Sequence, residues 1–122
     1  MAKVHLDEVE DVDIDANGRF KYVLIKLYHP DSEENYKYIV RGYKWAGYHA
    51  DIYEDLYERV KKKGLDTECM GGGRILHEAE KKTITVYGYS QGYGLPDHSI
   101  TCELLKKKYK DYQSITWNNE GY

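Results

Sequence analysis

The stretch that most limits the fold of this chain is a strand-like run that is apolar on both of its faces. It spans residues 20–28 and reads FKYVLIKLY. Successive side chains on a strand point to opposite faces of a sheet, so a strand that is apolar on both faces has to be covered from both sides. The run therefore predicts the central strand of a sheet with other elements packed above and below it.

The rest of the chain supplies elements that can surround such a strand. Further strands are expected at residues 12–15, 36–43, 68–77, 82–90 and 114–117. Asn17-Gly18 predicts a hairpin turn after the first of these strands, and residues 30–35 read as a polar loop. Strands and helices do not alternate strictly, which favours an α+β fold over a doubly wound one. A length of 122 residues suits a single domain, residues 1–122.

Two segments have the period of a helix. Residues 48–63 place Ile52, Leu56 and Val60 on one stripe and charged residues on the opposite face, and Gly64 suits the stop. Residues 99–109 read as the second helix, with Ser99 as its N-cap.

Charge and apolar content argue against several classes of partner, although they leave room for a local basic pocket. The chain carries 18 basic and 21 acidic residues, interspersed, and its formal net charge is −3. Binding to a phosphate backbone depends on a basic surface, so this balance argues against nucleic acid. No stretch approaches the ~20 apolar residues of a membrane span, and residues 1–5 lack the apolar core of a signal peptide. The two cysteines are too few for a secreted disulfide scaffold, so we expect a cytoplasmic protein.

His49 is the most informative candidate for chemistry. It lies three and four positions before Ile52 and Tyr53, so it shares the apolar face of the predicted helix. It also lies at or just before the first turn, where the positive end of the helix dipole keeps the ring neutral near pH 7. A neutral imidazole can act as a general base or as a nucleophile. The alternative is a histidine that only closes the end of the apolar stripe.

Three basic residues on the predicted strands are candidates for binding an anion. Lys21 stands near the start of the central strand, and Arg74 follows Gly71-Gly72-Gly73. Arg41, on the strand expected at residues 36–43, is a weaker candidate. Three successive glycines pack nothing, so they predict a bulge or a close backbone approach that aims Arg74. Lysine presents a point charge, and arginine suits bidentate phosphate binding. The alternative for each is a surface side chain in solvent.

The loop after residue 89 is a fourth candidate. It reads YSQGYG over residues 89–94. Successive backbone N–H groups in such a loop, here at Gln91 and Gly92, can form an anion nest, and Ser90 adds a hydroxyl donor. A plain turn is the alternative.

Other motifs are absent from the sequence. There is no GxSxG, no HExxH, no P-loop and no cysteine phosphatase loop around Cys69 or Cys102. His5, His29, His77 and His98 are scattered along the chain, so we expect neither a metal nor another cofactor.

The candidate residues belong to longer motifs that extend over nearly the whole chain. RGYKWA at residues 41–46 is followed by YHADIY at residues 48–53. Shorter motifs are DVDID at 11–15, FKYVLI at 20–25, GGGRI at 71–75, VYGYS at 86–90 and the final GY at 121–122. In order and spacing these motifs resemble the 14-kDa phosphohistidine phosphatase family, which is also called the janus family.

The resemblance implies a fold and an activity. The fold is a six-stranded mixed sheet flanked by two helices. The activity is hydrolysis of the P–N bond of phosphohistidine in proteins, without a metal or other cofactor, by a monomer. Histidine-phosphorylated proteins and phosphate are the partners that it implies. The catalytic residue would be His49, and the residues at the phosphoryl group would be Lys21, Ser90, Gln91, Gly92, Arg74 and Arg41.

The chain departs from the family pattern at three places. Gly47 stands where an acidic residue is common, Gln91-Gly92 replaces Met-Ala, and the loop at residues 30–35 is shorter. The main alternative function is a phosphate- or phosphoprotein-binding module without catalysis. A third is an interaction protein that uses the surface of its 14 tyrosines.

Overall fold

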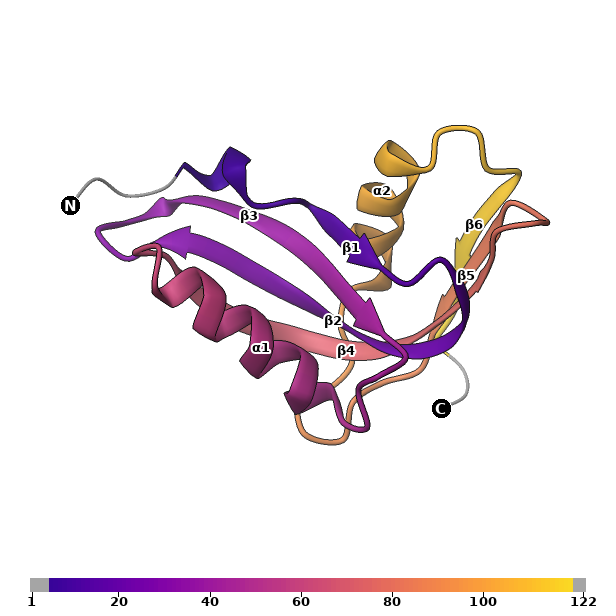
Figure 1. Cartoon of the computed structure of the whole chain (residues 1–122), viewed down its shortest axis with the longest axis horizontal. Helices are drawn as coiled ribbons and strands as arrows, with labels where there is room; N and C mark the ends of the chain where they lie inside the picture. Colours follow the sequence, from indigo (N-terminus) through magenta and orange to yellow (C-terminus); the bar gives the residue numbers. More distant parts are fainter. Residues whose placement is uncertain (1–4, 120–122) are drawn as a thin grey trace.

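A computed structural model describes residues 5–119, so the predicted GY motif at 121–122 lies outside the described residues. After a short 3-10 turn at Leu6–Glu8, the described residues fold into six strands and two helices (Figure 1). In chain order these are β1 (Val12–Ile14), β2 (Asn17–His29), β3 (Ser32–Tyr43), α1 (His49–Lys61), β4 (Asp66–Glu78), β5 (Thr83–Tyr87), α2 (His98–Lys108) and β6 (Ser114–Trp117).

The strands form one mixed sheet in the order β1-β3-β2-β4-β5-β6. The pairs β1–β3 and β5–β6 are parallel, and the other neighbours are antiparallel. Helix α1 packs on one face and α2 on the other. This architecture confirms the predicted α+β class. None of the described helices is long and apolar enough to cross a membrane.

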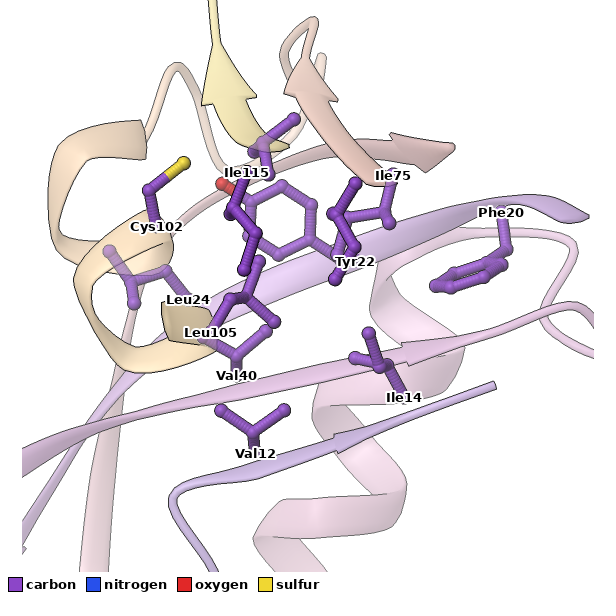
Figure 2. Packing of buried hydrophobic residues seen from close by; sticks show 12 residues of the cluster. Val12, Ile14, Phe20, Tyr22, Leu24, Val40, Ile75, Cys102, Leu105 and Ile115 are labelled. Carbon is purple, nitrogen blue, oxygen red and sulfur yellow. The ribbon is translucent and has the colours of Figure 1, made fainter. Parts of the chain in front are cut away.

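Strand β2 is the central, doubly covered strand that its sequence predicts. Tyr22 and Leu24 lie in the core under α2 (Figure 2). Val23 and Ile25 lie in the core under α1. None of these four side chains is more than 1 % exposed. Burial of large apolar side chains on both faces fixes β2 in the middle of the sheet and makes it a rigid support for residues at its start.

The predicted hairpin at Asn17-Gly18 is wrong. Both residues lie inside β2 and pair with β4, while β1 runs parallel to β3 at the edge of the sheet. The reason is that β3 and β4 occupy both edges of β2, which leaves β1 only the free edge of β3. Gly18 adopts a φ of +108°, a conformation that glycine allows where the chain passes from one strand to the other.

Several predicted boundaries also shift. The loop expected at residues 30–35 is a tight turn, since β3 already begins at Ser32. Strand β5 ends at Tyr87 because Gly88 has a φ of +76°, outside the extended region. The N-cap of α2 is Asp97 rather than Ser99, and the Asp97 carboxylate accepts the N–H of Ser99 at 3.0 Å. A carboxylate serves the positive end of a helix better than a hydroxyl does.

Candidate active site

The first residue of α1 is His49, which lies beside Ile52 on the buried side of the helix. The chain before it is extended, and the backbone N–H of Tyr48 donates to the Asp51 carboxylate at 2.9 Å. This contact caps the first turn of α1 and fixes the backbone position of His49. The prediction that His49 shares the apolar face is confirmed, because its side chain is only 9 % exposed.

A hydrogen bond to β4 orients the His49 ring. Its Nε2 lies 2.9 Å from the carbonyl oxygen of Gly73 on β4. A carbonyl only accepts, so Nε2 carries the proton and Nδ1 of the neutral ring has a free lone pair. Within residues 5–119 Nδ1 has no hydrogen-bond partner, although every buried side-chain nitrogen or oxygen there has one. It follows that Nδ1 is accessible from solvent.

The surroundings of His49 favour its neutral form. Burial lowers its pKa most, and the positive charges of Lys21 and Arg74 lower it further. The hydrogen bond to Gly73 acts in the opposite direction but does not outweigh them. The pKa of His49 is therefore below its ordinary value, and the ring is uncharged at neutral pH.

The glycine run on β4 makes room for this ring. A Cβ at Gly72 would lie 2.6 Å from Cδ2 of His49 and 2.8 Å from the Tyr22 carbonyl oxygen. The pairing of β2 with β4 also slips by one residue here, which leaves Met70 as the extra residue of a bulge. The prediction of a bulge or a close backbone approach at the glycines is confirmed, and both are present.

The loop after Ser90 faces the start of α1. It is closed by a pair of backbone hydrogen bonds between Ser90 and Gly94, and the N–H of Tyr93 donates to the buried Ser90 hydroxyl oxygen at 3.1 Å. In the described part of the chain, the N–H groups of Gln91 and Gly92 have no partner. A small anion can accept hydrogen bonds from both amides.

A pocket of about 540 Å³ brings most of the predicted residues together. Lys21 of β2 and His49 of α1 line it, and so do Ser90, Gln91 and Gly92 of the loop. A cation, two free amides and an accessible imidazole nitrogen can hold a tetrahedral oxyanion and supply a base or a nucleophile beside it.

The two arginines differ in their positions. Arg74 pairs with Lys21 across β2 and β4, and its charge acts on His49. Arg41 does not line this pocket. It is 6 % exposed, and its guanidinium donates to the carbonyl oxygens of Val40 at 2.8 Å and Glu10 at 2.7 Å. Those bonds hold the segment before β1 against β3.

Sequence reasoning missed the residues that support the loop. The ring of Tyr93 packs edge-on against Tyr53 of α1, with ring centroids 5.5 Å apart. The Tyr53 hydroxyl in turn bonds the Thr67 hydroxyl of β4 at 2.8 Å. These contacts tie the loop to the helix that carries His49. The only sequence signal was the position of Tyr53 on the apolar stripe.

Within residues 5–119, no group of three or more His, Cys, Asp or Glu side chains is arranged to hold a metal ion. His98, the first residue of α2, is buried instead in a polar network, where it contacts the Tyr22 hydroxyl at 2.6 Å and the Gly88 carbonyl at 2.9 Å.

The fold and the site define a small α+β domain with a pocket that His49, Lys21 and the Ser90 loop line. A model of the Janus/Ocnus family matches residues 6–113. The chain is 52 % identical to a 14 kDa phosphohistidine phosphatase from Sus scrofa, over 99 % of this chain and 98 % of that protein. It is 51 % identical to the protein of the same name from Homo sapiens, over the full length of both. It is 47 % identical to the sex-regulated protein janus-A from Drosophila pseudoobscura pseudoobscura, over 100 % of this chain and 83 % of that protein. The chain belongs to the Janus/Ocnus family.

Proposed function

We propose that this protein is a protein phosphohistidine phosphatase that hydrolyses the P–N bond without a metal ion. Two observations support this. The first is the full-length likeness to relatives that are named for this activity. The second, which carries the chemical argument, is the accessible Nδ1 of a neutral His49 in a pocket that Lys21 and the Ser90 loop also line.

In the proposed complex the phosphoryl oxygens bind to Lys21, to the Ser90 hydroxyl and to the amides of Gln91 and Gly92. Phosphoryl transfer depends mainly on positioning and on stabilising charge, and these donors supply both. Because the Ser90 oxygen already accepts the N–H of Tyr93, its proton is available to the phosphoryl group. Arg74 adds positive charge at the side of Lys21.

His49 completes the reaction in one of two ways. As a general base, its Nδ1 removes a proton from a water molecule, whose oxygen attacks phosphorus as the P–N bond breaks. As a nucleophile, Nδ1 itself takes the phosphoryl group, and water then hydrolyses this second P–N bond. In both routes the departing imidazole gains a proton, from His49 or from solvent, and inorganic phosphate is released.

The test is release of inorganic phosphate from a phosphohistidine peptide by the wild type and by His49→Ala. We expect a loss of about 10²–10⁴-fold in kcat, the usual effect of removing a general base. His29→Ala, at the far end of β2, is the matched control. Activity of His49→Ala equal to that of wild type would refute the role of this residue.

A phosphate-binding module without catalysis is the second candidate. It predicts that the phosphopeptide binds and that no phosphate is released. The same assay with a chelator tests the metal-free mechanism, because a chelator-sensitive rate contradicts it. We also propose that the protein acts as a monomer in the cytosol, which size-exclusion chromatography and cell fractionation can check.

A further inference from the structure

A second, smaller basin adjoins the pocket that contains His49, which is called the phosphate pocket below, and shares Lys21 with it. Its volume is about 240 Å³, and its lining includes Arg19, Lys44 and Arg74 besides Lys21. No carboxylate stands among the described residues that line it. Four cations around one basin contrast with the chain as a whole, whose net charge is −3.

Strands β2 and β4 and the segment after β3 bring these cations together. Lys21 lies directly opposite Arg74 in the pairing of β2 with β4. The Arg19 guanidinium donates to the Tyr87 hydroxyl at 2.6 Å. The stem of Lys44 passes over β2, since a Cβ at Gly18 would lie 3.1 Å from its Cδ. The charges therefore gather at the start of β2, beside the phosphate pocket.

Three of the four cations, Lys21, Lys44 and Arg19, have no acidic partner among the described residues. Within residues 5–119, the ammonium groups of Lys21 and Lys44 have no ion-pair partner, and Arg19 bonds only a neutral phenol. Asp15 is the nearby acid, and its carboxylate accepts the backbone N–H of Lys44 at 2.7 Å. An anion in the basin would therefore meet the charges of Lys21, Lys44 and Arg19, which no described carboxylate pairs with.

We propose that this basin is a second anion subsite, which binds the carboxylate of an Asp or Glu beside the phosphohistidine of the substrate protein. The inference rests on the proposed function. Lys21 lines both cavities, so a group in the basin and a phosphoryl group in the pocket lie close enough to belong to one peptide. Arg19 and Lys44 are exposed at the rim, where arginine can bind a carboxylate with two parallel hydrogen bonds.

The test compares two phosphohistidine peptides that differ only by Glu or Gln next to the phosphohistidine. We expect kcat/KM to be about fivefold higher for the Glu peptide at low salt, the size that two exposed ion pairs provide. The preference should disappear at about 1 M salt, where exposed charges are screened.

Charge reversal at the rim tests the residues. Lys44→Glu should remove the preference for the Glu peptide and favour a third peptide with Lys at that position. Lys110→Glu, an equal charge change on an exposed lysine between α2 and β6, should keep the wild-type preference. Equal rates on the Glu and Gln peptides, or an unchanged preference in Lys44→Glu, would overturn the subsite and leave the proposed function intact. If no peptide is hydrolysed, the proposed function fails and the subsite fails with it.

Discussion

Replacing Gly72 by alanine should displace the His49 ring and cost most of the catalytic rate. The added Cβ would lie 2.6 Å from His49 Cδ2, whereas ordinary contact begins at 3.4 Å. The ring therefore has to move by about 0.8 Å. The Tyr22 carbonyl oxygen, 2.8 Å from the same Cβ, is backbone of the central strand and cannot give way easily.

The displacement acts on the 2.9 Å hydrogen bond between Nε2 and Gly73, which fixes the tautomer. Misplacement of a catalytic group by about 1 Å can cost about 10²-fold in rate, and we expect a loss of that order in kcat for Gly72→Ala. Overpacking should also lower the free energy of unfolding by about 1–3 kcal/mol. Phosphate affinity should change less, because the atoms nearest to the added Cβ belong to His49 and to the Tyr22 carbonyl, and not to Lys21 or the amides of Gln91 and Gly92.

Steady-state kinetics on a phosphohistidine peptide and urea unfolding measure the two effects separately. Gly47→Ala is the matched control, since a Cβ there would meet only the Asp51 carboxylate at 3.8 Å. A folded Gly72→Ala with the kcat of the wild type, or a Gly47→Ala that loses as much activity, would refute this role of Gly72.

Two further predictions concern pH and Arg41. Because the pKa of His49 is lowered in the folded protein, kcat/KM should fall only below pH ~6.5. Lys21→Met removes a positive charge that lowers this pKa, so it should move the fall in kcat/KM to higher pH. A fall centred above pH ~7 in the wild type would contradict the lowered pKa. A pKa that is lower in the folded than in the unfolded protein makes the free energy of unfolding depend on pH. The contribution of His49 is full above pH ~6.5, and urea titrations should show the free energy of unfolding decreasing as the pH falls below that value. Arg41→Met should lower the free energy of unfolding by about 2 kcal/mol, because two carbonyl oxygens lose their partner. It should raise KM less than Lys21→Met does, and the reverse order would place Arg41 at the substrate.

The sequence predicted best those features that depend on local pattern. The two-sided apolar run required a covered central strand, and β2 is that strand. The stripe that starts at His49 required the ring to face the core side of α1, as it does. Strand order could not be predicted in this way, because Asn17-Gly18 has the same local preference whether β1 pairs with β2 or with β3.

The site residues also fall into those that local sequence could predict and those that it could not. Lys21, His49 and the Ser90 loop could be proposed from residue type and position, and they meet in one pocket. Arg41 could not be placed, because its position depends on the carbonyl oxygens of Glu10 and Val40 that its side chain reaches. The contact of Tyr53 with Tyr93 joins residues far apart in the chain, and no local pattern signals it.

The most direct test of the account is nuclear magnetic resonance of the protein labelled with ¹⁵N in its histidines. At pH 7 we predict a neutral His49 with the proton on Nε2 and an unprotonated Nδ1. Added inorganic phosphate should shift the Nδ1 signal of His49 in the wild type and should do so far more weakly in Lys21→Met. A protonated Nδ1 at pH 7, or a His49 spectrum that phosphate leaves unchanged, would contradict the claim that a neutral imidazole faces an anion site.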